Sequence, residues 1–336
     1  MSSIDVSSLL SALSDAEPAG RNLEDDVAFT NLQAAAKHKP DQQFGETVIA
    51  GEEPDWRAVA SGAGDLLGRT RDLRVGVILT RALIRTDGAE GLADGLSAIQ
   101  RWLEGMWDAV HPQLDPADPD PTQRVNIVAG LDDFEATVRA VRDMPIAVSR
   151  TVGRVSYKDI LVATNKLPAA PGKTDPPSFA AIEAAFQDAP TEQVQKTASD
   201  LERALGAIGA IEQAFTARVG AAKSVGLGQL GATVKGAHQA VGEQLAKKIG
   251  SASVSGAEGA AAGAPAAPPG EVRTRDDAIK ALDRICDYFD RHEPSSPVPL
   301  LLRRAKRLIN KSFMDLIRDM ASNGVSQVEV LRGSEE

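Results

Sequence analysis

Apolar residues recur at steps of three and four through most of the chain, which is the spacing of one buried face on an α-helix. In residues 65–88, DLLGRTRDLRVGVILTRALIRTDG, this spacing predicts one amphipathic helix with arginines on its other faces. Gly88 is the predicted stop at its C-terminal end. The predicted buried stripe consists of Leu66, Thr70, Leu73, Val77, Thr80 and Ile84.

Two further helices follow in the same region. Residues 91–110 carry a second stripe, and a third helix is predicted through 124–144 after a proline-rich loop. Asp120 or Thr122 is the candidate cap of this third helix. Residues 1–165 are therefore predicted to form an N-terminal helical domain. The second stripe consists of Leu92, Leu96, Ile99, Leu103, Met106 and Val110.

Residues 176–249 form a second predicted helical region. The segments FAAIEAAFQDA and ASDLERALGAIGAIEQAFTARVG have helical spacing and predict a small central hairpin or part of a bundle. The segment KSVGLGQLGATVKG has spaced glycines but lacks the preceding strand of a dinucleotide-binding unit. We therefore predict a loop there.

The composition changes abruptly at residues 250–270, GSASVSGAEGAAAGAPAAPPG. Nineteen of these twenty-one residues are Ala, Gly, Ser or Pro. Such a segment buries too little apolar surface to offset the entropy of ordering it. We predict a disordered, flexible linker between the helical regions.

Residues 271–336 are predicted to form a small C-terminal helical domain, which makes the whole chain all-α. Two helices flank the proline-rich loop EPSSPVP, and SQVEVLR is a candidate for one short terminal strand. Cys286 lies beside the apolar face of the first helix and is predicted to be a core residue rather than a nucleophile. The predicted apolar faces include Ala278, Leu282, Ile285 and Phe289 on the first helix, and Leu301, Ala305, Leu308, Ile309, Phe313, Leu316, Ile317 and Met320 on the second.

The charges of this C-terminal region are separated along the chain. Residues 276–293 carry six acids against three bases, whereas residues 303–311 carry five bases and no acid. Each run is either a solvated face, or half of a pair within one subunit, or half of a head-to-tail contact between neighbouring subunits. Heterologous contacts of the last kind close into rings. The candidate interface residues are Asp283, Asp287, Asp290, Pro297, Pro299, Arg303, Arg304, Arg307 and Lys311.

The net charge of −10 argues against partners that are themselves polyanions. Nucleic-acid affinity depends on basic residues that neutralise phosphates, and docking on anionic lipid has the same requirement. The sequence has no apolar run of eighteen or more residues, and its N-terminus lacks the basic start of a signal peptide. A single cysteine excludes an internal disulfide. These features predict a cytoplasmic protein without a nucleic-acid partner or direct membrane insertion.

One stretch, WDAVHPQLDPADPDPTQRVN at residues 107–126, resembles a reaction centre. His111 is surrounded in sequence by aspartates, as in a metal site or a general acid–base site: Asp108, Asp115, Asp118 and Asp120. A calcium loop would need a central glycine and a terminal glutamate, but four prolines occupy this segment instead. The four histidines of the chain are far apart in sequence. We therefore interpret the stretch as a rigid connection between helices, with a metal-dependent hydrolase as the alternative.

Other enzyme motifs are absent from the sequence. There is no GxxxxGK[ST] phosphate loop, no GxSxG elbow and no HExxH pair. The sequence therefore predicts no catalytic, cofactor-binding or metal-binding residue, and the chain is not expected to be an enzyme.

Four colinear blocks resemble the ImpA-type N-terminal domain of the TssA proteins of the bacterial type VI secretion system. They are PAGRNLEDD (18–26), KPDQQFGETVIAGEEPDWRAV (39–59), RTRDLRVGVILTRALIRTDG (69–88) and WDAVHPQLDPADPDPTQRVN (107–126). The ending HEPSSPVPLLLRRAKRLINKSFMDLIRDM is similar to that of the short-form TssA proteins, and we identify no family resemblance for the middle region.

This resemblance implies a non-enzymatic, cytoplasmic assembly component without a cofactor. It implies a homo-oligomeric ring formed through the C-terminal part, and contacts with the baseplate, the tail tube and the contractile sheath. The alternative within the family is a scaffold that primes the sheath or caps its distal end.

Overall fold

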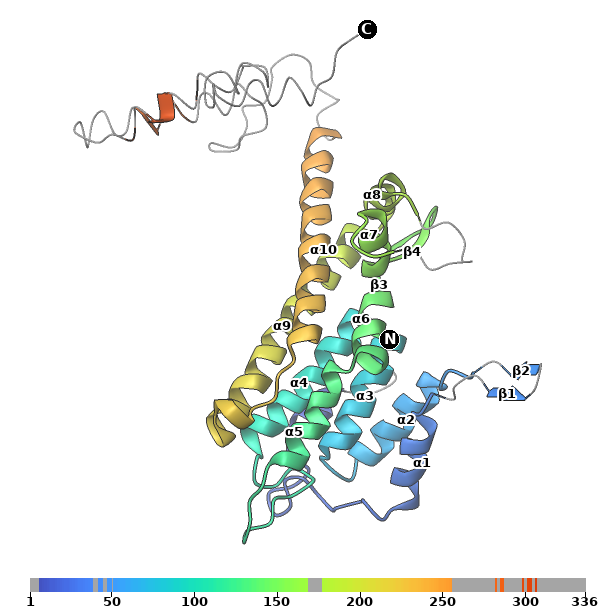
Figure 1. Ribbon diagram of the computed structural model, residues 1–336, viewed down its shortest axis with the longest axis vertical. Coiled ribbons are helices and arrows are strands. Elements are labelled where there is room, and N and C mark those ends of the chain that lie inside the picture. The colour runs from blue at the N-terminus through green and yellow to red at the C-terminus, as the bar shows by residue number, and fades with distance from the viewer. Residues whose placement is uncertain are drawn as a thin grey trace, which may run out of the picture. The chain divides into compact units, whose positions relative to one another are not determined.

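The computed structural model describes residues 6–38, 42–44, 47–49, 51–168 and 177–255, and a few positions between 282 and 306. The chain divides into two compact units, Met1–Glu258 and Gly259–Glu336. The first unit is predominantly helical (Figure 1). The helices of its N-terminal half are η1 (Val6–Leu10), α1 (Val27–Ala35), α2 (Trp56–Leu67), α3 (Leu73–Thr86), α4 (Ala89–Gly105), α5 (Thr122–Ala129), η2 (Gly130–Asp132), the π-helical turn η3 (Phe134–Val138) and α6 (Arg139–Asp143).

The remaining helices of this unit come from the middle of the chain. They are α7 (Tyr157–Ala163), α8 (Phe179–Asp188), α9 (Thr191–Val219), η4 (Ala221–Lys223) and α10 (Gly228–Ser255). The two predicted helices of the middle region are thus confirmed as α8 and α9, and α10 lies alongside α9 (Figure 1).

Helix α4 lies at the centre of the first unit, where it packs against both α3 and α9. The two apolar stripes predicted from the sequence are confirmed, because all of their residues are buried. Close helix approach depends on small residues. A side-chain carbon added at Gly76 would lie 2.7 Å from the Trp102 ring, and one added at Gly95 would lie 2.5 Å from Thr80 Oγ1. The α3–α4 contact is therefore tight enough to require glycine on both helices.

The single helix predicted over residues 65–88 is wrong, because the chain breaks between α2 and α3. Apolar spacing continues through the break, but the backbone there forms long-range hydrogen bonds instead. The amide of Arg71 donates to the Ala19 carbonyl (2.7 Å), and the Arg71 carbonyl accepts from the amide of His111 (2.9 Å). The Asp72 carboxylate then caps the new helix by accepting from the Arg74 amide.

The third predicted helix is also interrupted. After α5, the chain forms η2 and adopts extended backbone at Asp133, then restarts as η3 and α6. The Asp133 carboxylate accepts from the Ala136 amide (2.7 Å) and so caps the restart. Arg81 of α3 donates to the carbonyl of Gly130 (2.6 Å), which holds the interruption against the first helices.

The prediction of an all-α chain is only partly correct. Helices predominate, but strands are present as well. The described residues contain two antiparallel two-stranded sheets, β1 (Gln42–Phe44) with β2 (Thr47–Ile49) and β3 (Pro145–Ser149) with β4 (Gly153–Ser156). Gly153, the first residue of β4 after the tight connection, has a φ of +93°, a backbone conformation that favours glycine. The hairpin packs onto the core through the buried side chains of Ile146, Ala147 and Val155.

Helix α10 corrects two predictions. Residues from Gly228 onward are helical, so the loop predicted over 223–236 is wrong there. The buried residues Leu230, Val234, Ala237 and Val241 give this glycine-rich stretch an apolar face to pack against its neighbours. The helix also continues to Ser255, into the predicted linker, whose remaining residues 256–270 lie outside the described residues.

In the second unit, the structure describes only a few side chains. Cys286 is 6% exposed, which confirms its predicted burial. Ile285 and Leu301, which were expected to be buried, are 45% and 67% exposed in this single chain. The predicted terminal strand SQVEVLR lies outside the described residues.

Candidate functional site

His111 is part of the fold's interior and is separated from the neighbouring aspartates. It is 3% exposed, and its Nε2 donates to the carbonyl of Gly20 at 3.0 Å. Its backbone pairs with residues 71–73 between α2 and α3. The imidazole therefore fixes the PAGRNLEDD block against the WDAVHPQLDPADPDPTQRVN block.

The aspartates of this stretch are exposed and organise turns. Asp115 Oδ1 accepts from the amide of Ala117 (2.8 Å), and Asp120 Oδ1 accepts from the amide (3.1 Å) and hydroxyl (2.7 Å) of Thr122, at the start of α5. The hydrogen bonds from Thr122 lower the pKa of Asp120. Within the described residues, no three metal-binding side chains converge. The geometry needed by the metal-hydrolase alternative is thus not assembled around His111.

Arg124, in the same stretch, has a structural role. Its guanidinium is fully buried and donates to three backbone carbonyls, those of Trp107 (2.6 Å), Val110 (2.8 Å) and Pro112 (2.8 Å). It also lies 5.0 Å from the centre of the Trp107 ring. Burial lowers the pKa of Arg124 to about 10, so the group remains charged at neutral pH. One side chain thus holds the proline-rich connection in shape.

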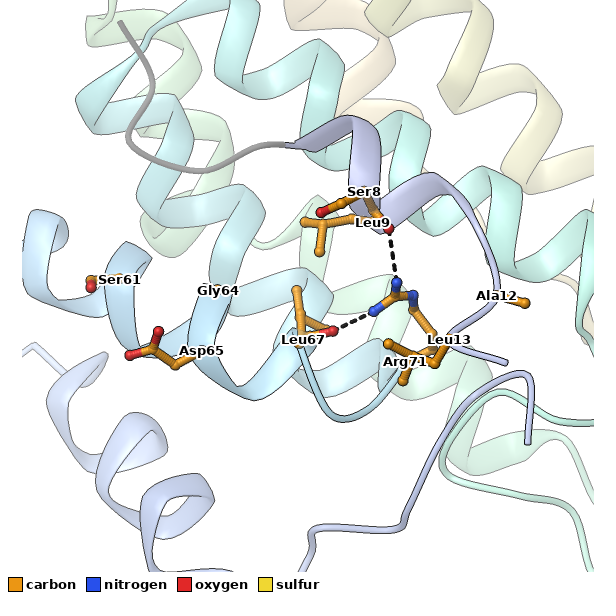
Figure 2. Close-up of a pocket in the computed structure, with 10 residues that line it drawn as sticks. Ser8, Leu9, Ala12, Leu13, Ser61, Gly64, Asp65, Leu67 and Arg71 are labelled. Atoms are coloured by element: carbon orange, nitrogen blue, oxygen red, sulfur yellow. Dashed lines mark hydrogen bonds between the residues drawn. The ribbon is translucent and has the colours of Figure 1, made fainter. Parts of the chain in front are cut away.

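Arg71 performs the same task for the N-terminal segment. Its guanidinium donates to the carbonyls of Ser8 (2.9 Å), Ser11 (3.0 Å) and Leu67. Figure 2 shows the guanidinium between Ser8 and Leu67. These residues line a cavity of about 530 Å³. Burial lowers the pKa of Arg71. Because its donors already bond to backbone carbonyls, the arrangement acts as a clamp on the first helices.

Arg74 completes the connection. It forms a two-pronged ion pair with Asp72 (2.7 Å for the closest pair of atoms) and a second pair with Glu24 (3.1 Å), and its guanidinium lies 4.7 Å from the centre of the Phe29 ring. Burial alone would lower the pKa of Arg74, but the two carboxylates outweigh it and raise the pKa. Residues from three of the four blocks that resemble the family, 18–26, 69–88 and 107–126, therefore meet in one cluster that joins η1, α1, α3 and the segment before α5.

Sequence reasoning missed the roles of these arginines because it placed the arginines of residues 65–88 on the other faces of the predicted helix and assigned no role to Arg124. Arg71 and Arg124 are 2% and 0% exposed. One feature of the sequence could have indicated their burial. Arg71 and Arg124 both lie inside colinear blocks, among apolar residues that are themselves buried.

The middle region is attached to α4 by a network of ion pairs. Asp200 of α9, whose side chain is 8% exposed, accepts from Lys196 (3.0 Å) and Arg203 (3.1 Å). Arg203 also pairs with Asp94 of α4 (2.9 Å), and Lys196 pairs with Glu90 (3.0 Å). The charges fix the register of α9 on α4 around an apolar contact.

The interface residues predicted in the C-terminal region are mostly beyond the part of the chain that the structure describes. Arg303 is helical and exposed. The others lie outside the described residues: Asp283, Asp287, Asp290, Pro297, Pro299, Arg304, Arg307 and Lys311. Among the helices that are described, none is long and apolar enough to span a bilayer.

Comparisons with known proteins agree with the blocks that form this cluster. Residues 10–133 match the family model of ImpA, N-terminal, type VI secretion system. The chain is 38% identical over 345 residues to the type VI secretion system component TssA1 of Pseudomonas aeruginosa, with 99% of each chain covered.

A solved structure supports the same relationship. It is the N-terminal domain, including the conserved ImpA_N region, of the TssA component of the type VI secretion system from Burkholderia cenocepacia. This structure is 25% identical and covers 74% of the present chain and 96% of its own, with a TM-score of 0.58. The likeness extends beyond residues 10–133, since it covers 74% of the chain. On the end-to-end match to TssA1, the chain belongs to the TssA family of type VI secretion system components.

Proposed function

We propose that the protein is a non-enzymatic structural component of the type VI secretion system. In this proposal it forms a ring that links the baseplate, the tail tube and the contractile sheath during assembly in the cytoplasm. The observation that carries the proposal is the match to TssA1 along 99% of both chains. The contacts of Arg71, His111 and Arg124 support it, because these side chains hold backbone segments together.

Ring formation is proposed for the C-terminal region, 271–336. Ile285 and Leu301 are exposed apolar residues in the single chain, as residues covered by a neighbouring subunit would be. The acidic run at 276–293 and the basic run at 303–311 offer complementary charge for a head-to-tail contact.

Reversal of Arg304 and Arg307 to glutamate tests this contact. We expect the R304E/R307E protein to shift to the mass of a monomer in light scattering, because like charges would then face each other. A matched control is R57E/R101E, which makes the same charge change at two exposed arginines of the first unit. Unchanged assembly mass in R304E/R307E, or equal dissociation of the control, would overturn the head-to-tail contact.

The partners are tested by separate pull-downs with baseplate, sheath and tube subunits. The proposal expects baseplate subunits to be retained together with sheath or tube. Retention of sheath subunits alone would favour the alternative of a sheath-priming or distal-end scaffold. Retention of none of them would contradict both forms of the proposal.

A further inference from the structure

A small cavity lies between α7, α8 and α10, in the middle region of the chain. Its volume is about 180 Å³, below the range of about 300–1,000 Å³ that small-molecule pockets usually occupy. Its lining combines apolar and polar side chains: Tyr157, Ile160, Leu161, Thr164, Lys166, Phe179, Gly236, Gln239, Ala240, Glu243 and Gln244.

Gln244 is the unusual member of this lining. It is 4% exposed, and its Oε1 is buried without a hydrogen-bond partner among the described residues. A buried polar group without a partner destabilises a folded protein, so its presence needs a reason. A ligand that enters the cavity and hydrogen-bonds to this amide supplies one.

The shape of the cavity depends on the close contact between Tyr157 and Gly236. A side-chain carbon at Gly236 would overlap the Tyr157 hydroxyl, so only glycine leaves room for that hydroxyl beside α10. Burial raises the pKa of Tyr157, and its hydroxyl therefore stays protonated at neutral pH. Gly236, Ala240 and Gln244 follow one another at steps of four on α10, which places them on the same face of the helix.

The lining of the cavity includes one side chain of each charge. Lys166 and Glu243 are both exposed, and neither forms an ion pair within the described part of the chain. Phe179 adds an exposed aromatic side chain, 37% accessible, at the same lining. A partner with an apolar residue between an acidic and a basic one would complement this arrangement.

We propose that this cavity binds one apolar side chain of an extended peptide segment from a partner protein, with the Gln244 amide hydrogen-bonded to the peptide backbone. The unpartnered Gln244 Oε1 can accept a hydrogen bond from a backbone N–H of the peptide. The volume suits one side chain. The site belongs to the first unit, whereas ring formation is proposed for the C-terminal region, and the present proposal holds whether or not a ring forms.

Saturation-transfer NMR on the full chain tests the proposal with N-acetyl-leucinamide as the probe. We expect saturable transfer to the leucine methyl groups with a Kd on the order of millimolar, as for a ligand of this size. N-acetylglycinamide, which lacks the side chain, should give no saturable signal. Absence of saturation by N-acetyl-leucinamide at about ten times that concentration, or equal binding of both probes, would overturn the proposal.

Two variants test the residues. Gln244→Leu keeps a similar shape but removes the amide, so we expect binding to fall at least tenfold while the midpoint of thermal unfolding stays the same or rises. Gln213→Leu makes the same change at an exposed position of α9 and should bind like the parent protein. Gly236→Ala, which displaces the Tyr157 hydroxyl, should also weaken binding. Parental affinity in both Gln244→Leu and Gly236→Ala would refute the assignment.

Discussion

Buried arginines connect segments of the N-terminal half that are far apart in sequence. Arg71 bonds to carbonyls of the first residues, the partly buried Arg74 pairs with Glu24 before α1, and Arg124 bonds to the segment that precedes α5. A guanidinium presents several donors in a fixed plane, which suits three carbonyls at once. Lysine in the same place would offer one point charge, so these positions depend on arginine itself.

Arg124→Met should therefore destabilise the protein strongly. The change leaves the carbonyls of Trp107, Val110 and Pro112 buried without a donor, and each lost partner costs about 1–3 kcal/mol. We expect a loss of about 3–5 kcal/mol in the free energy of unfolding, measured by urea denaturation.

The control for this substitution is Arg101→Met, at an exposed arginine of α4. A surface change of this kind should alter the free energy of unfolding by no more than about 0.5 kcal/mol. Similar losses in the two variants would show that the three carbonyl contacts of Arg124 carry little stability.

At the scale of elements, the apolar pattern identified helices well and their ends less well. The stripes through Leu66 to Ile84 and Leu92 to Val110 are buried as predicted, because helical spacing reports a buried face directly. The break at residues 68–72 was missed because Thr70 and Leu73 continue that spacing. What interrupts the helix is backbone pairing with Ala19 and His111, a long-range contact that local spacing does not encode.

The β3–β4 hairpin was missed for a related reason. Its strands, PIAVS and GRVS, are short, and the sequence around them has no two-residue turn of the usual kind. The one local signal is Gly153 between two stretches that contain β-branched residues. The hairpin is held by its environment, since Asp188 at the end of α8 accepts from the Ser149 hydroxyl (2.8 Å) and the Arg150 amide (2.8 Å).

This contact predicts a dependence of stability on pH. The hydrogen bonds from Ser149 and Arg150 lower the pKa of Asp188 below its usual 3.8. Its folded-state pKa lies below the unfolded one, so the stabilisation is present above pH 3.8 and is lost as the pH falls through the folded-state value. Asp188→Asn should therefore lower the urea midpoint of unfolding above pH 4, and the difference from the parent should shrink at lower pH.

Asp25→Asn, at an exposed aspartate before α1, serves as the control for this pH series. Its difference from the parent protein should be small across the same range. A constant difference for Asp188→Asn at every pH would contradict the assignment of this dependence to the Asp188 carboxylate.

At the scale of the molecule, the middle region completes the N-terminal core. Helix α9 covers α4, and the Phe215 ring of α9 meets the edge of Trp107 with ring centres 5.4 Å apart. Leu201, Ile208 and Ile211 of α9 are buried in the same core. The sequence predicted an N-terminal domain that ends at residue 165 but not this packing, because apolar spacing on an amphipathic helix does not show which other helix it packs against.

Two fragments test this dependence. Residues 1–165 should expose the face of α4 that α9 covers, and each buried side chain that loses its contact costs about 1.5–3 kcal/mol. We expect this fragment to aggregate or to unfold well below a fragment of residues 1–255, as measured by size-exclusion chromatography and thermal unfolding. Equal unfolding midpoints would instead support an independent domain that ends at residue 165.

The direction in which the chain leaves helix α10 depends on the number of residues in the last turns of that helix. Lys248 is anchored by the carbonyls of Phe186 and Gln187, and the chain stays helical from there to Ser255. Each residue added to a helix turns its end by about 100° and advances it by about 1.5 Å. One inserted residue would therefore point the outgoing chain in a new direction, whereas seven would restore the original azimuth to within about 20°. An insertion or deletion between Lys248 and Ser255 therefore mainly changes the direction in which the chain leaves the helix, and changes the length of the helix only slightly.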